Sequence, residues 1–233
     1  MAQIEIYAKP SSLYRYRRLG ESAAQEIAAL LESYVYCPSY SDLNDPMEGK
    51  HRLSARLQKD PNFGKSNSRI KAAFDALGVA SFSEVHNHEP MWAHYADEFK
   101  GMCIQYNLNK LLKGLGPGTA ITRMMYSKQE PVLIDDSSNA VDRARKCLSS
   151  KTVRWASERE WRVFSERRGE AGYEERSTVT RIYLGSRVSD DDEATVLAAA
   201  KEIGVPVSKM DINAYALEFK LLWAPVRRKP KPR

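Results

Sequence analysis

The chain has 233 residues, of which 42% are hydrophobic and 28% are charged, and this is the composition of an ordinary globular protein. A chain of this length forms one large domain or two small ones. Its net charge of +6 permits an anionic partner, such as a nucleotide, a nucleic acid or a phosphorylated substrate, without requiring one. No apolar run approaches the ~20 residues of a membrane span, which excludes a transmembrane protein.

Cysteine usage and the first residues of the chain indicate the compartment. The three cysteines, Cys37, Cys103 and Cys147, lie far apart and show no Cys-x-x-Cys spacing. An odd number of scattered cysteines argues against a disulfide framework and favours a reducing environment. The N-terminal residues carry neither the basic nor the apolar region of a signal peptide. These features predict a soluble cytoplasmic protein.

The first half of the chain alternates short strands with two amphipathic helices. Apolar residues recur at helical spacing in both helices, and Gly78 follows the second as a helix-ending residue. Between them lies a loop rich in turn-forming residues. The expected elements are, in order, a strand at 13–17, a helix at 20–33, a strand at 33–37, a loop at 39–49, a helix at 68–77 and a strand at 79–83.

The second half begins with a short helix, in whose first turn Pro90 is tolerated because no N–H is needed there. Near the end of the chain, Ser189 is placed to cap a helix with three aspartates in its first turn. The expected elements are a helix at 89–98, strands at 101–106 and 119–126, a helix at 138–148, strands at 155–164 and 181–184, a helix at 190–203, and strands at 205–210 and 214–222.

The order of these elements predicts the fold class. There is no internal repeat and no regular alternation of strand and helix, as a parallel α/β sheet would require. We therefore predict a single α+β domain over residues 1–225, with a mixed or antiparallel central sheet and peripheral helices. Residues 226–233 form a basic, Pro-rich tail that is predicted to be disordered.

The segment 155–164 is the most informative part of the chain. As a strand, it places Trp161 and Val163 on one face and Glu158, Glu160 and Arg162 on the other. Such a strand could present charge to a cleft from its polar face. The alternative is a half-buried edge strand whose charged face is solvated.

Two earlier clusters could bind an anionic ligand. Arg15 could grip a phosphate or pyrophosphate in bidentate fashion, with Tyr14 beside it. The alternative is aromatic packing on one side of the strand and solvated arginines on the other. Asn44 and Asp45 precede Pro46, which is sufficient for a turn, but either side chain could also hydrogen-bond a ligand hydroxyl.

The segment 91–97 reads Met-Trp-Ala-His-Tyr-Ala-Asp on a predicted helix. Trp92 and Tyr95 could stack on a flat ring such as a nicotinamide or a base, although a Trp-rich amphipathic helix usually packs in a core. His94 lies near acidic residues one turn later and is interpreted as a structural histidine or a ligand contact. The histidines and cysteines show no paired ligand spacing, so no metal site is expected. Nucleotide-binding glycine motifs and the common hydrolase motifs are also lacking.

In this order, the motifs resemble those of a bacterial family of unknown function. Its members carry an LYRY-type start, an NDP[FM]E loop, an FS strand, a [ML]WAHYAD helix, a G-[FM]-C-I strand and an E-x-EWR strand. The corresponding residues of this chain are Leu13–Tyr16, Ser39–Glu48, Phe82–Ser83, Met91–Asp97, Gly101–Ile104 and Glu158–Arg162.

More distantly, the chain is similar to ADP-ribosyltransferases of the DNA-modifying toxin type, which open with an LYHF-like strand and carry a catalytic glutamate on a late strand. This resemblance implies that Arg15 orients NAD, that Ser83 or Tyr95 supports the nicotinamide ribose, and that Glu160 is catalytic. Here Tyr95 lies on a predicted helix rather than a strand, so the middle role does not map cleanly. The further candidate residues for contacts with NAD in this chain are Tyr14, Asn44, Asp45, Trp92, His94 and Arg162.

Three functions follow from these considerations. The first is an NAD-consuming ADP-ribosyltransferase or NAD glycohydrolase, a toxin or phage-defence effector with a nucleic-acid or protein acceptor and an inhibitory partner protein. In that reaction a carboxylate stabilises an oxocarbenium-like centre. The second is a non-catalytic nucleotide- or nucleic-acid-binding module. The third is a metal-dependent phosphodiesterase that uses Glu158, Glu160 and Asp45.

Overall fold

The computed structural model describes residues 9–134, 139–213 and 215–226. Within the chain, two compact units can be distinguished. Unit 1 comprises residues 1–31, 84–114 and 175–233, and unit 2 comprises residues 32–83 and 115–174. Helices accompany a mixed, mostly antiparallel sheet, so the predicted α+β class is confirmed. A single domain over 1–225 stays a prediction, and all but the first residue of the basic tail lies outside the described residues.

Unit 1 contains five sheet strands in the order β14-β13-β12-β5-β1. Every neighbouring pair is antiparallel except β12 and β13, which run parallel. A parallel pair needs a crossover connection, and helix α7 supplies it. The strands are β1 (Ser12–Arg17), β5 (Met102–Asn107), β12 (Val179–Leu184), β13 (Val207–Asn213) and β14 (Ala216–Trp223).

The helical segments of unit 1 are placed by capping signals and apolar faces. In α7, the Ser189 hydroxyl accepts a hydrogen bond from the amide of Asp192, and Gly204 ends the helix at a φ of 72°. Helix α4 buries Met91 and Trp92 in an apolar cluster. The segments are η1 (Gly20–Ser22), α1 (Ala23–Glu32, whose last residue belongs to unit 2), α4 (Glu89–Tyr95), α5 (Leu108–Gly114), η4 (Arg176–Thr178) and α7 (Asp190–Ile203).

Unit 2 is built around three antiparallel strands, β4 (Gly78–Ser83), β10 (Glu160–Ser165) and β6 (Thr119–Arg123), with β10 in the middle. Three two-stranded pairs surround them: β2 (Tyr34–Cys37) with β11 (Gly169–Gly172), β3 (Arg52–Leu53) with β8 (Val132–Leu133), and β7 (Met125–Ser127) with β9 (Ser150–Thr152). The helical segments are η2 (Tyr40–Asp42), α2 (Ala55–Gln58), α3 (Phe63–Ala76), α6 (Ala140–Leu148) and η3 (Val153–Glu158).

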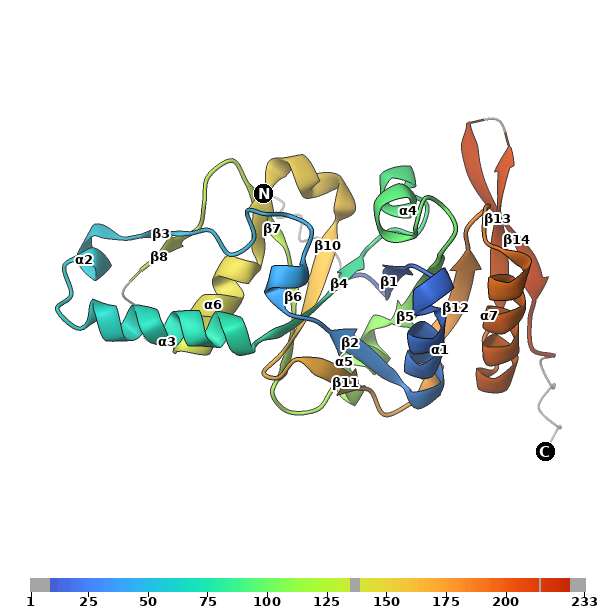
Figure 1. The fold of residues 1–233 in the computed structure, drawn as a ribbon, viewed down its shortest axis with the longest axis horizontal. Helices are drawn as coiled ribbons and strands as arrows, with labels where there is room; N and C mark the ends of the chain where they lie inside the picture. The colour runs from blue at the N-terminus through green and yellow to red at the C-terminus, as the bar shows by residue number, and fades with distance from the viewer. Residues whose placement is uncertain (1–8, 135–138, 214, 227–233) are drawn as a thin grey trace, which may run out of the picture. The chain divides into compact units, whose positions relative to one another are not determined.

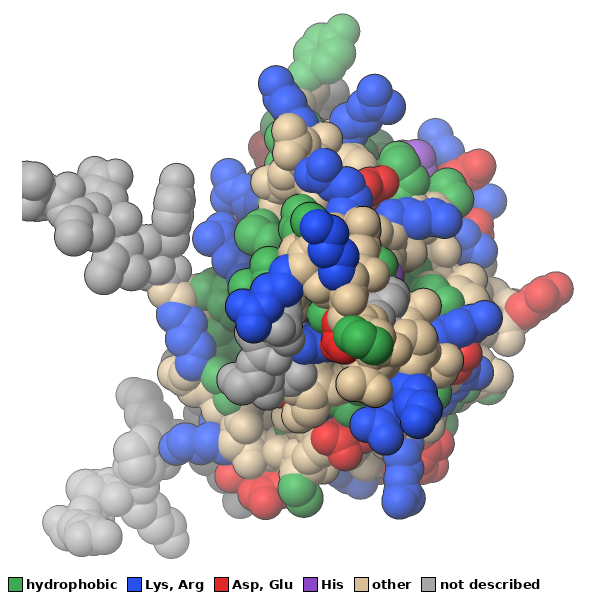
Figure 2. All heavy atoms as spheres, turned by 90° about the vertical axis from the view of Figure 1, so that its left-hand side faces the viewer, with side chains coloured by type: hydrophobic (Ala, Val, Ile, Leu, Met, Phe, Trp, Pro, Cys, Tyr) green, Lys and Arg blue, Asp and Glu red, His purple; other side chains and the backbone are tan. Residues whose placement is uncertain are grey.

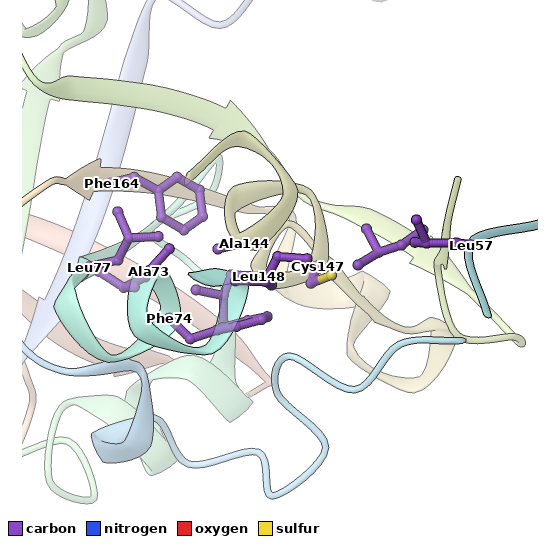
Figure 3. Close-up of a cluster of buried hydrophobic side chains, with 11 residues drawn as sticks. Leu57, Ala73, Phe74, Leu77, Ala144, Cys147, Leu148 and Phe164 are labelled. Atoms are coloured by element: carbon purple, nitrogen blue, oxygen red, sulfur yellow. The ribbon is translucent and has the colours of Figure 1, made fainter. Parts of the chain in front are cut away.

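The apolar core of unit 2 lies between α3, α6 and the sheet (Figures 1 and 3). Phe74 and Leu77, from α3 and the residue that ends it, meet Ala144 and Leu148 of α6, and Phe164 of β10 faces the same cluster. Every one of these side chains is less than a tenth exposed. Phe164 of β10 thereby shares a core with α6, whose last residue, Leu148, accepts a hydrogen bond from Arg162 of the same strand.

Among the predicted elements that differ from the structure, three differ in where the chain turns or breaks. The expected strand 155–164 is a 3₁₀ helix up to Glu158, followed by a reversal at Arg159 (φ 46°) and then β10. The expected helix 89–98 ends at Tyr95, and residues 97–99 all have positive φ, which turns the chain into β5. The expected strand 119–126 is broken at Met124, whose amide donates to the carbonyl of Glu160.

Gly78 has a different role from the predicted one. Helix α3 ends before it, and Gly78 is the first residue of β4. A Cβ atom at this position would lie 2.7 Å from the backbone oxygen of Cys37 in β2, so only glycine permits this close approach of β4 to β2. None of the helices in the described part of the chain is both long and apolar enough to cross a bilayer.

Candidate functional site

The charged residues of β10 face each other in the interior of unit 2. Glu160 and Arg162 are two residues apart on one strand, so their side chains share a face. The Nε atom of Arg162 donates to Oε1 of Glu160 over 2.7 Å, and Nη2 donates to Oε2 over 3.3 Å. Both side chains are at most 5% exposed. The predicted charged face exists, but it is buried rather than open to a cleft.

All five N–H donors of Arg162 find acceptors. Besides Glu160, its Nη1 and Nη2 atoms donate to Oε2 and Oε1 of Glu48 over 2.7 and 2.6 Å, which is a bidentate ion pair. Nη1 also donates to the carbonyl of Leu148, at the end of α6. A guanidinium offers five N–H groups, and all five are engaged. Arg162 therefore joins the Asn44–Glu48 loop, helix α6 and strand β10.

Lys151 of β9 completes this buried charge cluster. Its ammonium donates to Oε2 of Glu158 over 2.8 Å and to Oε2 of Glu160 over 3.2 Å. It also lies 4.5 Å from the centre of the Trp155 ring, which is a cation–π contact. The Lys151 side chain is only 3% exposed. We refer to Glu48, Lys151, Glu158, Glu160 and Arg162 as the buried charge cluster.

Electrostatics keeps these groups ionised despite their burial. Burial raises the pKa of Glu160, but Arg162, Lys151 and hydrogen bonds outweigh it and lower the pKa to about 2. Burial lowers the pKa of Lys151, yet the two glutamates at its ammonium raise it above the ordinary value. Glu160 is thus a permanent carboxylate at neutral pH, and it cannot act as a general acid there.

An open pocket of about 440 Å³ adjoins the cluster at Lys151. It is formed by the segment after η2, the loop after β7, and strand β9. Its volume falls in the range of small-ligand sites. The lining residues are Asp45, Met47, Lys50, Arg52, Ser127, Lys128, Gln129, Glu130, Pro131, Ser150, Lys151 and Thr152.

Positive charge predominates in the pocket lining. Four cations line it against two carboxylates. Arg52 is engaged by Gln129 over 3.2 Å and lies 3.8 Å from Glu130. Lys50 and Lys128 are exposed. Lys and Arg side chains gather over the face of unit 2 that carries α2 and β3 (Figure 2). The pocket is therefore suited to an anion.

One hydroxyl in the pocket lining has no partner within the described ranges. Oγ1 of Thr152 is buried and makes no hydrogen bond to any described residue. Buried hydroxyls are normally paired, so an unpaired one beside a pocket is a candidate ligand contact. Ser127 and Ser150 add two further hydroxyls to the lining. Hydroxyls together with cations are the groups that commonly bind phosphate oxygens.

Three of the predicted site residues lie in unit 2 without belonging to the charge cluster. Asp45 is 3% exposed and lines the pocket, and its Oδ1 accepts a hydrogen bond from the amide of Met47. Asn44 is exposed. Ser83 is fully buried, and its hydroxyl donates to the carbonyl of Glu158 over 2.7 Å. This bond places Ser83 as a support for the end of η3, and a contact of Ser83 with NAD stays a prediction.

The remaining predicted site residues lie in unit 1. Arg15 is 6% exposed on β1, where it lies opposite Ile104. Trp92 is fully buried, donates to the carbonyl of His86 and packs against other rings, so stacking on a ligand would require this packing to open. Tyr14 is part of the same aromatic packing, since its ring lies 5.0 Å from that of His86.

Tyr95 and His94 occupy the end of α4. His94 is exposed and Tyr95 is half-buried, with ring centres 6.3 Å apart. Tyr95 lies on a helix, as the sequence predicts. Its correspondence to a middle-strand residue of the ADP-ribosyltransferases, and a role of His94 at NAD, stay predictions.

Sequence reasoning missed Glu48, Lys151 and the pocket cations. Glu48 closes the Asn-Asp-Pro-Met-Glu motif, so the motif itself was the available signal. Lys151 lies on a three-residue strand with no motif, and nothing in the local pattern distinguishes it. Lys50 and Lys128 are 78 positions apart in the chain, and both line the pocket where β3 pairs with β8 and β7 pairs with β9.

The donor set does not fit the predicted catalytic metal. Glu158 and Glu160 both contact the Lys151 ammonium, which is where a cation between them would have to lie. Asp45 already binds a backbone amide. Within the described ranges, no group of three or more His, Cys, Asp and Glu side chains could hold a metal ion.

Comparison with known proteins supports the predicted family type. Residues 91–163 match the family described as "Protein of unknown function (DUF2971)". The matched segment contains the Met91–Asp97 motif and ends inside β10, just after the Glu158–Arg162 motif. Similarity to a family of unknown function is thereby confirmed for this segment, and the likeness to ADP-ribosyltransferases stays a prediction. No curated protein and no solved structure matches the chain.

Proposed function

We propose that this protein binds the phosphate group of a nucleotide or a nucleic acid in the pocket of unit 2. The observation that carries the proposal is the lining of this 440 Å³ pocket, in which four cations face two carboxylates. A phosphate needs both charge and hydrogen-bond donors, and the pocket offers lysines, an arginine and three hydroxyl groups. The net charge of +6 favours the approach of such an anion.

Lys151 has a particular role in this proposal. It reaches from the charge cluster to the pocket wall, and its position is fixed by Glu158, Glu160 and the Trp155 ring. A cation that is already held in place loses little conformational entropy when an anion binds. Lys50 and Lys128 are exposed and would supply the adaptable contacts.

Binding is tested with pyrophosphate, NAD and a short single-stranded DNA, using intrinsic tryptophan fluorescence, to which Trp155 beside Lys151 contributes, as one readout and calorimetry as the other. A variant with both Lys50→Ala and Lys128→Ala should bind at least about tenfold more weakly, since a hydrogen bond to a charged group contributes about 1.5–3 kcal/mol. Wild-type binding should also weaken as salt is added.

The matched control is Lys201→Ala, which removes an exposed lysine on α7 of unit 1. This variant should bind like the wild-type protein. Equal affinity of the double lysine variant and the wild-type protein for all three probes would refute the proposal. So would binding that does not respond to salt.

The second candidate function is NAD consumption at Glu160, as an ADP-ribosyltransferase or an NAD glycohydrolase. The observation in its favour is that Glu160 remains ionised, with a pKa of about 2, and shares Lys151 with the pocket. A fixed carboxylate can stabilise an oxocarbenium-like centre as the nicotinamide–ribose bond breaks. The role of Arg15 in orienting NAD stays a prediction from the sequence, as do a nucleic-acid or protein acceptor and an inhibitory partner protein.

Nicotinamide release from labelled NAD, with DNA, RNA or protein as acceptor, tests this second candidate. Glu160→Gln should lower turnover about 10²–10⁴-fold if the carboxylate is catalytic. Glu170→Gln, an exposed position on β11, is the matched control and should leave turnover unchanged. Unchanged turnover in Glu160→Gln would exclude catalysis by this residue.

A further inference from the structure

The outer strand of the unit 1 sheet has an open edge. β14 is the last strand in the sheet order, and in the described ranges only β13 pairs with it. The β13–β14 hairpin extends beyond the end of β12 (Figure 1). Only residues 207–209 of β13 pair with β12, whereas the pairing of β13 with β14 continues to Asn213. An unprotected edge strand exposes a row of backbone N–H and C=O groups that can pair with another strand.

The usual protective features of an edge are weak on β14. The strand contains no proline, and its one lysine, Lys220, is ion-paired with Asp211 of β13. The β-bulge that shifts the register lies at the C-terminal end of the strand, near Leu222. The segment from Ala216 to Leu221 therefore forms a regular ladder with β13 and presents a regular outer edge.

One face of β14 is apolar and extends the unit 1 core. Leu217 and Phe219 pack against the apolar cluster that contains Trp92 and Tyr183, and the Phe219 ring centre lies 4.9 Å from that of Tyr183. Leu221 follows on the same face, but it is 59% exposed. The apolar face of β14 thus continues past the packed residues Leu217 and Phe219 to an exposed leucine.

The other face of β14 carries Glu218 and Lys220, which are both exposed. These charges are complementary to a second copy of the same strand. If two β14 strands pair antiparallel about a two-fold axis at Phe219, Glu218 of each strand lies opposite Lys220 of the other. The same register places Leu217 opposite Leu221. Opposite charges and apolar pairs directly across an antiparallel ladder are the favourable combinations.

We propose that β14 mediates self-association, in which the edge strands of two copies of this chain pair antiparallel and centre on Phe219. The arrangement is isologous, since the same surface is used by both copies. It forms two interchain ion pairs on one face and covers Leu221 with apolar side chains on the other. Self-association through β14 is independent of phosphate binding, because β14 belongs to unit 1 and the pocket to unit 2.

Sedimentation equilibrium of the full chain over a concentration series tests this proposal, with circular dichroism to check folding. The wild-type protein should form a reversible dimer. Glu218→Lys places two lysines opposite each other across the interface, and Lys220→Glu places two glutamates opposite each other. Each variant should raise the dissociation constant at least about tenfold, because favourable cross-strand pairs become repulsive ones.

A mixture of the two variants provides the decisive result. One variant then carries only lysines at these positions and the other only glutamates, so a heterodimer should form about as tightly as the wild-type dimer. Glu202→Lys, which makes the same charge change at an exposed position of α7, should leave the wild-type dimer intact. A monomeric wild-type protein, no recovery in the mixture of folded variants, or equal weakening by Glu202→Lys would each overturn the proposal.

Discussion

Replacing Lys151 with methionine tests the buried charge cluster directly, because methionine keeps much of the side-chain length and removes the charge. In the wild-type protein, the carboxylates of Glu48, Glu158 and Glu160 contact the two cations Lys151 and Arg162, which leaves a net charge of −1. Without Lys151, three carboxylates face one guanidinium. The Lys151 side chain is 3% exposed, so solvent screens these charges weakly. We expect a loss of about 3–5 kcal/mol in the free energy of unfolding at neutral pH.

Urea unfolding followed by circular dichroism measures this loss. Lys71→Met, the same chemical change at an exposed position of α3, should alter stability by less than about 0.5 kcal/mol. Combining Lys151→Met with Glu158→Gln returns the net charge of the cluster to −1 and should recover part of the loss. The difference in the free energy of unfolding between the wild-type protein and Lys151→Met should shrink as pH falls, because the unpaired carboxylates of the variant take up protons.

Two results would refute this reasoning. The first is a loss below about 1 kcal/mol for Lys151→Met at neutral pH, which would mean that the glutamates are not isolated from water. The second is a double variant that is no more stable than the single one. Either result would show that charge balance does not hold this cluster together.

Three further predictions concern the same unit. Folding lowers the pKa of Glu160 from 4.5 to about 2. The extra free energy of unfolding that the ionised Glu160 gives the wild-type protein over Glu160→Gln should therefore be complete above pH 4.5 and be lost as the pH falls to about 2, which thermal unfolding of both proteins against pH measures. Ser83→Ala should cost about 1–3 kcal/mol in urea unfolding, because the buried carbonyl of Glu158 loses its donor, and an unchanged midpoint would contradict this. Gly78→Ala should lower the free energy of unfolding by about 1–3 kcal/mol, since its Cβ would lie 2.7 Å from the Cys37 oxygen. A variant as stable as the wild-type protein would show that β4 can move away from β2 freely.

Local signals were sufficient to predict the elements whose limits are set within the segment itself. Helix α7 has the bounds expected from the sequence, because Ser189 caps its first turn and Gly204 provides the left-handed residue after its last turn. The segment 155–164 was predicted only in part. Its alternating pattern identifies the face shared by Glu160 and Arg162, but the reversal at Arg159 depends on backbone conformation that the pattern does not encode.

The surroundings of the charged face could not be predicted from periodicity. Alternation shows which side chains share a face, and it does not show what covers that face. Arg162 is covered by Glu48, which is 114 positions earlier in the chain, and by the carbonyl of Leu148. These contacts join segments that are far apart in the sequence. The same limit applies to the pocket, whose cations come from three separate segments.

The two proposed functions of unit 2 differ in one requirement, which is whether Glu160 must give up a hydrogen-bond partner. Phosphate binding uses side chains that already line the pocket, and it leaves the buried charge cluster intact. Catalysis by Glu160 requires its carboxylate to reach a ribose, and therefore to give up a partner, because both of its oxygens already accept hydrogen bonds. The two longer bonds, 3.2 Å from Lys151 and 3.3 Å from Nη2 of Arg162, both end on Oε2, so Oε2 is easier to release than Oε1, which accepts the 2.7 Å bond from Nε of Arg162. In Glu160→Gln, Lys151 keeps its bond to Glu158 and its contact with the Trp155 ring, so pyrophosphate binding should persist, while a loss of NAD turnover in the same variant would be specific to catalysis.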